Sequence, residues 1–589
     1  MSSASPSSSP SPRWRGVALV VAAAAVSLLS APRGALAVTL LLDPARAAAA
    51  DSARLARLLA DLRSADSTVC DLAAQQIGNG RDGEWWGEGT DRERYNHPLV
   101  REARSLRVRD LKDGATTSLL RQAVRDDSRC VRSVAVRALG RARPSGTYDL
   151  LLALLRDGSA GMRETGALGL GEMEDRQAIA PLTNALRDDA VEVRAMSAWA
   201  LGEIESPRAI EALAGALKDR APSVREAAAR ALGEIEDASA VPALDAALDD
   251  EAEVVRRTAA WALGEIESPS GVEALARALR DRSVEVRKVA AWALGEIESP
   301  RGVQALAAAV ADASPEVRRT AAWALGEIED ASGVDVLAPL LRDRDEQVRL
   351  AAVHAMGEIE SPRGVDALTA AVRDESPAIR KQAVWALGEI EDAAAVPALA
   401  AALRDTSTEL RTMAARALGE IEDARGVEPL GTVLSDPVAE VRKMAAWAMG
   451  EIEDASAVPL LIPALKDRDP EVRATAAHAL GEIESPRAFD ALTAALQDES
   501  SAVRRAAEWA LRELDDERGT SEQRSRGRAR DTGASGDDGV RGDWDTDHDV
   551  DQDTDRALDR LLAGDHGLYR ERVRVRERER ERVRVRTRS

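Results

Sequence analysis

The segment VRRTAAWALGEIE, residues 255–267, has a counterpart at regular intervals along most of the chain. Its first arginine, Arg256, recurs every 31 residues (256 − 225 = 31) without an insertion, from Arg132 to Arg504. A fixed period of this size is typical of repeat proteins, in which each unit completes its apolar core against its neighbours. The sequence therefore predicts one long array of repeats rather than several globular domains.

Each repeat divides into two predicted helices. In residues 237–267, Asp237 can cap a first helix over Ala240–Leu248, whose apolar residues have helical spacing. A second helix is expected from about Val254 to Leu263, with Gly264 at its end. The pattern predicts an all-α fold.

Two looser copies precede the regular run, at Val100-Arg101 and at Val69-Cys70, where cysteine replaces the arginine. With the 13 regular copies ((504 − 132)/31 + 1 = 13), they predict about 15 two-helix repeats. Cys70 and Cys130 would then lie two repeats apart, too far for a disulfide bond unless the irregular loop over Gly78–Pro98 collapses this spacing. We therefore expect two unpaired thiols.

The repeat unit is D-x-x-A-V-P-A-L-x-x-A-L-x-D-x-x-x-x-V-R-x-x-A-A-x-A-L-G-E-I, over roughly Ala53–Glu517. It resembles the short HEAT repeats of the phycobilin-lyase type. The resemblance implies a right-handed α-solenoid with a 31-residue period and a ladder of aspartate–arginine pairs along it. An aspartate stands six residues before each regular arginine, from Asp126 to Asp498. We assign these pairs to structure, because such carboxylates can bind helix N-termini and stacked arginines.

The N-terminus is typical of an export signal. Arg13 and Arg15 precede an apolar run over Gly16–Leu29, and Ala35-Leu36-Ala37 fits a cleavage site. We predict a signal peptide over residues 1–37, cleaved after Ala37, and a periplasmic or secreted protein. An uncleaved N-terminal membrane anchor is the alternative.

The rest of the chain falls into four predicted segments. Residues 38–52 form a linker, residues 53–130 form irregular N-terminal repeats, and residues 131–517 form the regular solenoid. In the irregular part, Trp85-Trp86 lies among glycines and either covers the end of the array or forms a ligand-gripping loop. Residues 518–589 are polar and of low complexity, so we expect disorder, with a short helix over 555–562.

Charge is unevenly distributed. The chain has a net charge of −22, which excludes nucleic-acid binding through the bulk charge of the body. Residues 570–589 instead hold ten arginines against four glutamates. This tail could contact an acidic polymer or a membrane surface, or pair with the aspartates between Asp543 and Asp555, or remain a solvated polyampholyte. Those aspartates lack the glycine turn and terminal glutamate of a calcium loop, so we disfavour calcium binding.

One column of the second helix departs from the usual pattern. On a helical wheel the core-facing residues cluster on one side, and the fifth residue after the repeat arginine (position +5) lies on the opposite side. A small or charged residue is expected there, but seven of the eleven tryptophans occupy it. The column consists of Trp199, Arg230, Trp261, Trp292, Trp323, His354, Trp385, Arg416, Trp447, His478 and Trp509.

Position +1 lies one helical turn before position +5 on the same face. It is basic before six of the seven column tryptophans, at Arg257, Lys288, Arg319, Lys381, Lys443 and Arg505. We expect cation–π contacts within each of these pairs. The HEAT resemblance implies that second helices line the concave side, so these 17 residues form a candidate binding groove. Alternatively, the tryptophans stack mainly on each other and form a packing spine.

The repeats also end in a regular acidic motif, E-I-E, with Glu203 and Glu205 or Glu265 and Glu267 as examples. Solvated loop charge is the preferred explanation of this motif.

No catalytic or metal-binding pattern is evident in the sequence. His354 and His478 share the +5 column but lie four repeats apart (478 − 354 = 124), too far to share a metal ion. We therefore expect no cofactor, and a non-enzymatic scaffold that binds a protein or peptide along the concave groove. The alternatives are a lyase or hydroxylase on the same scaffold, or a glycan-binding module using the tryptophans as platforms.

Overall fold

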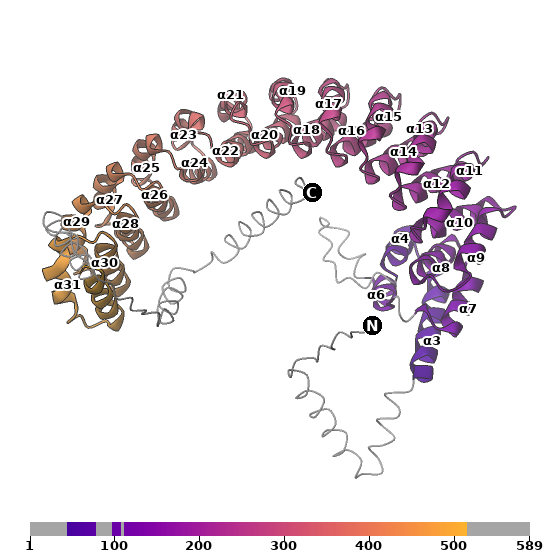
Figure 1. Ribbon diagram of the computed structural model, residues 1–589, viewed down its shortest axis with the longest axis horizontal. Coiled ribbons are helices and arrows are strands. Elements are labelled where there is room, and N and C mark those ends of the chain that lie inside the picture. The colour runs from indigo at the N-terminus through magenta and orange to yellow at the C-terminus, as the bar shows by residue number, and fades with distance from the viewer. Residues whose placement is uncertain (1–43, 78–96, 108–110, 515–589) are drawn as a thin grey trace, which may run out of the picture. The chain divides into compact units, whose positions relative to one another are not determined.

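The computed structural model describes residues 44–77, 97–107 and 111–514. The predicted signal peptide, the Trp85-Trp86 segment and the C-terminal tail, including the short helix over 555–562, lie outside these ranges. Within them the chain is an array of helix pairs in a curved row (Figure 1). The predicted all-α solenoid is confirmed.

Each regular repeat contains a short first helix and a longer second helix. The first helices are α9 (Thr147–Leu155), α11 (Ile179–Ala185), α13 (Ile210–Ala216), α15 (Val241–Ala247), α17 (Val272–Ala278), α19 (Arg301–Ala309), α21 (Gly333–Leu337), α23 (Val365–Ala371), α25 (Val396–Ala402), α27 (Val427–Val433), α29 (Val458–Ala464) and α31 (Phe489–Ala495). The second helices are α10 (Ala160–Glu172), α12 (Val191–Glu203), α14 (Pro222–Glu234), α16 (Glu253–Glu265), α18 (Val284–Glu296), α20 (Pro315–Glu327), α22 (Glu346–Glu358), α24 (Pro377–Glu389), α26 (Thr408–Glu420), α28 (Ala439–Glu451), α30 (Pro470–Glu482) and a last helix over 501–514.

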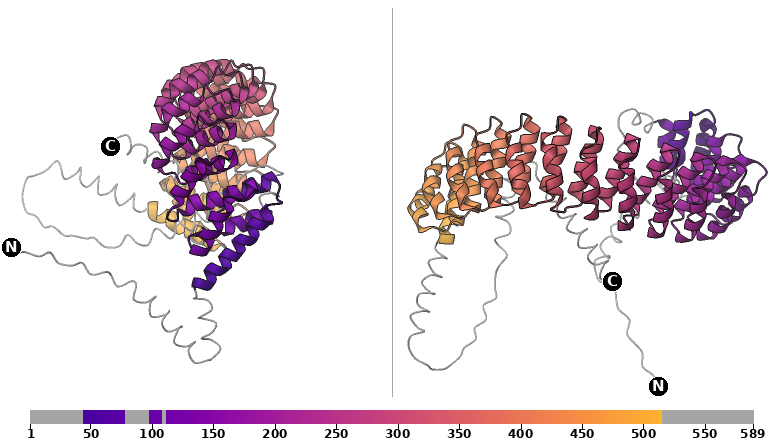
Figure 2. Two further views of the ribbon diagram at one scale, coloured as in Figure 1. Left: turned by 90° about the vertical axis from the view of Figure 1, so that its right-hand side faces the viewer. Right: turned by 90° about the horizontal axis from the view of Figure 1, so that it is seen from above.

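The two kinds of helix form two rows. The first helices lie on the outer side of the curve and the second helices on the inner side (Figure 1). Seen from above, the helices of successive repeats run side by side across the row (Figure 2). Each second helix packs against the second helices before and after it, as α14 does against α12 and α16. The inner row is therefore a continuous surface built from equivalent positions.

The start of the first helix α15 follows the sequence prediction. Asp237 accepts a hydrogen bond from the Ser239 amide and begins a single 3-10 turn, η5 (Ala238–Ala240), which leads into α15. Pro242 lies in the first turn of α15, where a missing amide hydrogen does no harm. The cap and the turn together fix the direction in which the chain enters the repeat.

The end of the second helix differs from the prediction. Gly264 does not terminate α16, which continues to Glu265 and is capped by Ile266. The left-handed residue after the cap is Glu267, with φ 49°. A glutamate holds this conformation in every regular repeat from Glu174 to Glu484, although glycine would adopt it with less strain. Gly264 instead packs against the next second helix, α18.

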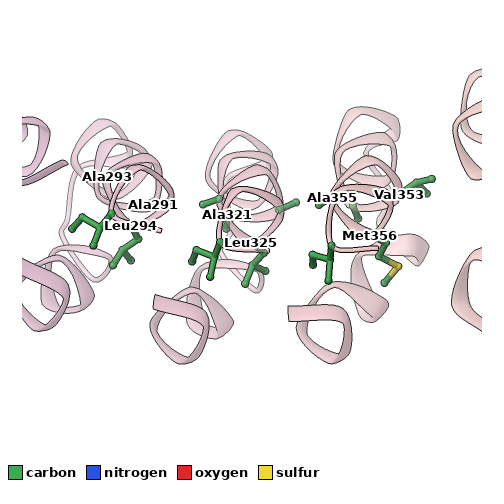
Figure 3. Close-up of a cluster of buried hydrophobic side chains, with 14 of the residues drawn as sticks. Ala291, Ala293, Leu294, Ala321, Leu325, Val353, Ala355 and Met356 are labelled. Atoms are coloured by element: carbon green, nitrogen blue, oxygen red, sulfur yellow. The ribbon is translucent and has the colours of Figure 1, made fainter. Parts of the chain in front are cut away.

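The core lies between the two rows. Val255, Ala259 and Leu263 of α16 are fully buried, as is Leu244 of the first helix α15. Equivalent residues repeat along the array, and Figure 3 shows those of three successive second helices, including Leu294, Leu325 and Met356. Each repeat therefore covers the apolar face of its neighbour, as the 31-residue period predicts.

An arginine–aspartate ladder joins the repeats. The Arg256 side chain is buried and donates from Nε and Nη2 to both carboxylate oxygens of Asp281, at 2.7 and 3.0 Å. Its Nη1 donates to the backbone carbonyl of Asp250 at 2.9 Å. Asp281 in turn accepts from the Ser283 amide. The same bidentate pairing with the aspartate 25 residues later occurs from Arg163–Asp188 to Arg473–Asp498, and links each repeat to the next.

The N-terminal end is built differently from the array. Helices α3 (Pro44–Leu62) and α4 (Ser67–Gln76) pack directly on α7 (Gly114–Ala123) and α8 (Arg129–Ala142). The copy expected at Val100-Arg101 is the single helix α6 (Pro98–Ser105), which packs against α4. Helix α3 begins at Pro44, inside the segment that the sequence assigns to a linker.

The prediction of two unpaired thiols is wrong. Cys70 of α4 and Cys130 of α8 form a disulfide bond, with their Cα atoms 5.4 Å apart. The prediction placed a complete repeat between the two cysteines. Because α6 lies beside α4 and does not separate it from α8, α4 and α8 are direct neighbours.

In the described ranges no helix is both long and apolar enough to cross a membrane.

Candidate functional site

The +5 column lies on the inner row of helices and is partly open to solvent. The core-facing residues of α16, such as Val255 and Leu263, point toward the first helices, and Trp261 projects from the other side of the helix. All seven column tryptophans are half-buried, and His478 is half-buried as well. Arg230, His354 and Arg416 are exposed. The indoles are therefore neither sunk between the rows nor freely exposed.

Each column tryptophan rests on a glycine of the preceding repeat. A Cβ atom added to Gly264 would lie 3.0 Å from Cζ3 of Trp292, and one on Gly295 would lie 2.9 Å from Cζ3 of Trp323. The same glycine column also faces an alanine of the next helix, Ala293 in the case of Gly264. The glycine of the A-L-G-E motif is thus required by this close approach, and the indole edge is fixed in place by it.

The contacts of the indole rings run between repeats. His478 stacks on Trp509 with the ring centroids 4.1 Å apart, and His354 lies 5.1 Å from Trp385 in a tilted arrangement. The guanidinium of Arg230 lies over the Trp261 ring at 5.3 Å. Arg230, His354 and His478 therefore cover the tryptophan of the following repeat, whereas Arg416 pairs with Glu420 at 2.7 Å.

A further cation–π contact involves a residue that sequence reasoning missed. Arg137 of α8 lies over the Trp199 ring at 5.4 Å and also pairs with the buried carboxylate of Glu172. Arg137 occupies position +5 of its own repeat, which is the signal that could have identified it. Among the described residues no ring contact between two column tryptophans occurs, so the tryptophans do not form the stacked spine considered as an alternative.

The basic residues at position +1 bind carboxylates. Lys288 pairs with Glu285 at 2.7 Å, Lys381 pairs with Glu409, and Lys443 pairs with Glu440 at 2.9 Å. In the described part of the chain, neither recorded cation–π contact involves a +1 residue. The expected pairing within each repeat is thus wrong, because a glutamate one turn before position +1 or in the next repeat attracts the cation more strongly. Arg257, Arg319 and Arg505 are exposed on the same face.

A shallow, open hollow lies where the column and the +1 residues meet. It is lined by Arg230, Arg257, Thr258, Trp261 and Val289, from the second helices α14, α16 and α18. The hollow brings two guanidinium groups to one indole, an arrangement that suits recognition of a ligand surface.

Carboxylates flank the column on its other side. Glu234 and Glu265 are the last residues of α14 and α16, nine residues after the repeat arginine (position +9), and both are half-buried. Burial, and then the neighbouring charge of Glu203, raises the pKa of Glu234 to about 7. The Oε2 atom of Glu234 is buried without a hydrogen-bond partner. The interpretation as solvated loop charge is therefore wrong for Glu234 and Glu265, whereas Glu420 and Glu451 at the same position, and Glu205 and Glu267 at the end of the motif, are exposed as expected.

The histidines of the column each approach one carboxylate. His354 lies 3.9 Å from Glu358, and His478 lies 3.6 Å from Glu482. In the described ranges no three histidine, cysteine, aspartate or glutamate side chains come together in a way that could hold a metal ion.

Comparison with solved structures finds many helical-repeat proteins. The karyopherin Kap121p bound to the extreme C-terminus of the protein phosphatase Cdc14p is 16% identical, with a TM-score of 0.43, over 68% of this chain and 53% of the karyopherin. Human deoxyhypusine hydroxylase is 26% identical, with a TM-score of 0.21, over 43% of this chain and 99% of the enzyme. The complex of CpcE and CpcF of phycocyanin lyase from Nostoc sp. PCC7120 is 24% identical, with a TM-score of 0.26, over 38% and 93%. The chain thus spans about half of the karyopherin's length.

The family comparison rests on sequence. No curated protein matches the chain. The family model for HEAT repeats matches residues 116–194, 179–263, 243–316, 305–377, 365–438 and 427–512. These overlapping segments cover the regular array, well over half of the chain, and agree with the resemblance inferred from the repeat motif. The chain belongs to the HEAT-repeat family.

Proposed function

We propose that this protein is a non-enzymatic scaffold that binds a protein or peptide along the +5 column of its second helices. The observation that carries the proposal is the state of the column tryptophans. They are half-buried, fixed at one edge by the glycine of the preceding repeat, and not stacked on one another in the described part. Each indole therefore keeps part of its surface available for a partner.

The energetics of recognition favour this surface. Tryptophan and arginine are the residues that most often dominate binding energy at protein interfaces. A side chain that is already ordered in the free protein loses little conformational entropy when it binds. Because the contact between Gly295 and Trp323 orders the indole before binding, the column is a preorganised surface.

The same contact rules out the simplest mutational test. Replacing Trp292, Trp323 and Trp385 by alanine would remove half-buried rings that pack on Gly264, Gly295 and Gly357. We expect a loss of stability of roughly 2 kcal/mol or more for each. Lost binding in that variant would not separate recognition from folding.

Site-specific photo-crosslinking provides a sharper test. The photoreactive amino acid p-benzoylphenylalanine is placed singly at three exposed positions of the inner row, which are Arg257 and Arg319 at position +1 and His354 at position +5, and at three exposed control positions on the outer row. The controls are Arg208, Arg301 and Arg363. The probe is a random peptide display library selected on the wild-type protein, with the recovered peptides crosslinked to each variant.

We expect the selected peptides to crosslink at the three inner-row positions and not at the outer controls. Crosslinks that favour the outer positions, or a library that yields no binder, would contradict the proposal. Circular dichroism on every variant checks that the solenoid is intact.

A further inference from the structure

We infer that the hollow beside Trp261 binds a carboxylate of the partner segment, carried by an aspartate or glutamate next to an apolar residue. The inference rests on the proposed function, since it names the chemistry of the segment that binds the column. It follows from the side chains that line the hollow, from the hydrogen-bonding groups that they leave open, and from a second tryptophan of the column.

Two arginines of the hollow have no carboxylate partner. Arg230 of α14 and Arg257 of α16 are both exposed and line the hollow. Neither forms an ion pair or a hydrogen bond with another described residue. The guanidinium of Arg230 lies over the Trp261 ring at 5.3 Å. A guanidinium held over a ring by cation–π attraction still has N–H donors at its edge, which match the two oxygens of a carboxylate.

Thr258 adds a third open donor. It is 4% exposed and lines the same hollow. Its hydroxyl makes no hydrogen bond within the described part of the chain, although buried hydroxyl groups normally have a partner. Thr320, at the same position two repeats later, instead donates to the backbone carbonyl of Glu316 at 3.0 Å. The Thr258 hydroxyl is thus available to a ligand atom that enters the hollow.

The indole and Val289 form the apolar part of the hollow. A Cβ atom added to Gly233 would lie 3.1 Å from Cζ3 of Trp261, and Glu265 accepts a hydrogen bond from the Trp261 side chain. The ring is therefore held at two points before a partner binds. Val289 of α18 is half-buried and lines the same hollow. An apolar residue beside the ligand carboxylate would pack on the indole and on Val289.

The surrounding charge does not by itself attract an anion. Helices α14, α16 and α18 carry six carboxylates, at Glu226, Glu234, Glu253, Glu265, Glu285 and Glu296. They also carry six cations, at Arg225, Arg230, Arg256, Arg257, Arg287 and Lys288. The repeat arginines bind the ladder, and Lys288 pairs with Glu285. Recognition therefore depends on direct contacts, and a segment with a single carboxylate fits better than a polyacidic one.

The carboxylates of these helices leave the hollow open, because none of them lines it. Glu226 and Glu253 stand one turn before the two arginines, yet neither forms an ion pair with them in the described structure. Glu234 stands one turn after Arg230 and is likewise not paired with it among the described residues. Burial, and then the charge of Glu203, raises the pKa of Glu234 to about 7, so this carboxyl is only partly ionised at neutral pH. A ligand carboxylate would not have to displace a bound one.

Trp447 has a similar setting in which the cations are already paired. The residues that correspond to the two arginines of the hollow are Arg416 and Lys443. Arg416 pairs with Glu420 at 2.7 Å, and Lys443 is buried and pairs with Glu440 at 2.9 Å. Carboxylates of the chain itself thus bind the cations beside Trp447, whereas those of the hollow remain free for a ligand.

Saturation-transfer difference NMR on the full chain tests the inference, because it measures weak binding through the ligand signals. The probe is acetyl-Leu-Glu-Leu amide. The comparison probes are acetyl-Leu-Gln-Leu amide, which has no carboxylate, and acetyl-Leu-Gln-Leu with a free C-terminal carboxylate. The site variants are the double substitution Arg230→Gln with Arg257→Gln, and Thr258→Val. The matched control is Arg416→Gln, which removes an inner-row arginine that already has a carboxylate partner.

We expect the glutamate probe to bind wild type and Arg416→Gln equally, within about twofold. It should bind both about tenfold more tightly than the neutral glutamine probe, as charge-assisted hydrogen bonds allow. The double arginine variant should lose this preference, and Thr258→Val should reduce it about threefold. Unchanged melting temperatures of the variants show that the solenoid is intact.

The outcomes separate this inference from the proposed function. Equal binding of the glutamate and glutamine probes, or an unchanged preference in the double arginine variant, would overturn the inference. Tighter binding of the probe with the free C-terminus would assign the hollow to a chain end and overturn the assignment to an acidic side chain. Library peptides that still crosslink to the inner row would leave the proposed function standing in each case. If they fail to crosslink there, the proposed function fails.

Discussion

The N-terminal unit, residues 44–142, and the regular array, residues 163–504, hold neighbouring helix pairs together in different ways. In the array, a buried arginine of each repeat binds the aspartate of the next, as Arg318 binds Asp343. At the N-terminal end, Arg132 instead donates to Thr165 and to backbone carbonyls, and a disulfide bond joins α4 to α8. The comparison shows that the N-terminal unit adds a covalent cross-link where Arg132 has no aspartate partner among the described residues, beside the ion pair between Arg63 and Asp126.

Removing the disulfide bond should cause the largest loss of stability, and this loss should be confined to the N-terminal unit. The double substitution Cys70→Ala and Cys130→Ala opens a cross-link between residues separated by 60 positions. We expect the N-terminal unit to lose about 4 kcal/mol of stability, because the unfolded segment gains the corresponding loop entropy. Hydrogen exchange measured by mass spectrometry should quicken in α3 and α4 and remain unchanged in α18 and α20. An equal change in both regions would contradict a local role.

Breaking the ladder within the array should have the next largest effect. Arg318→Ala leaves the carboxylate of Asp343 without its bidentate partner in a largely buried setting, at an expected cost of about 3 kcal/mol. The matched control is Arg504→Ala, because Arg504 is exposed and, among the described residues, bonds only to the carbonyls of Asp498 and Glu499. That variant should lose about 1 kcal/mol or less. Urea denaturation of both variants measures the difference.

The close approach of second helices in the array provides a third test. A methyl group added by Gly295→Ala would lie 2.9 Å from Trp323 and 3.0 Å from the backbone of Ala324, so we expect a loss of about 2 kcal/mol. Gly215→Ala is the control, because nothing lies near its added Cβ atom. The control should be neutral or stabilise the protein by up to about 1 kcal/mol through helix propensity. Similar losses in both variants would show that Gly295 is not needed for the contact with the indole.

Replacing the glutamate at position +9 should give the smallest change in stability, and this change depends on pH. Glu172, near the N-terminal unit, pairs with Arg137 and Arg141, whereas burial and Glu203 raise the pKa of Glu234 to about 7. A pKa raised on folding means that Glu234 favours the folded state below about pH 4.5 and that this contribution is lost as the pH rises through 7. Glu234→Gln should therefore stabilise the protein by about 1 kcal/mol at pH 8, after allowance for partial exposure, and have less effect at pH 5.

The control for this pH dependence is Glu172→Gln, which removes the partner of two arginines. It should destabilise the protein at pH 8, the opposite sign to Glu234→Gln. Thermal unfolding across pH 5–8 measures both variants. A Glu234→Gln effect that does not change over this range would contradict the titration of that carboxylate.

Much of the array could be predicted from the sequence, because its signals are local and repeated. The 31-residue period, the cap at Asp237 and the helical spacing of Val255 and Leu263 each depend on a few neighbouring residues. The aspartate–arginine ladder, implied by the HEAT resemblance, is also present. The same wheel that placed the core residues put Trp261 on the opposite side, where the structure leaves it half-buried.

The remaining features depend on how one repeat meets the next. The task of Gly264 becomes clear only from its distance to Trp292, and the position of Arg230 over Trp261 joins residues 31 positions apart (261 − 230 = 31). The Cys70–Cys130 pairing required knowing that α6 does not stand between α4 and α8. The partial burial of Glu234 likewise comes from the neighbouring helix rather than from its own.

Because the ladder joins each repeat to the next one only, it has a consequence for the length of the protein. Each repeat arginine binds the aspartate of the next repeat, and its own repeat supplies an equivalent aspartate to the arginine before it. Removing or inserting 31 residues therefore restores the same arginine–aspartate pair on both sides of the change. Tandem gene duplication or deletion could thus lengthen or shorten the array by whole repeats. Each repeat adds or removes one second helix of the inner row. The length of the array would then change in evolution while every arginine–aspartate pair between repeats is kept.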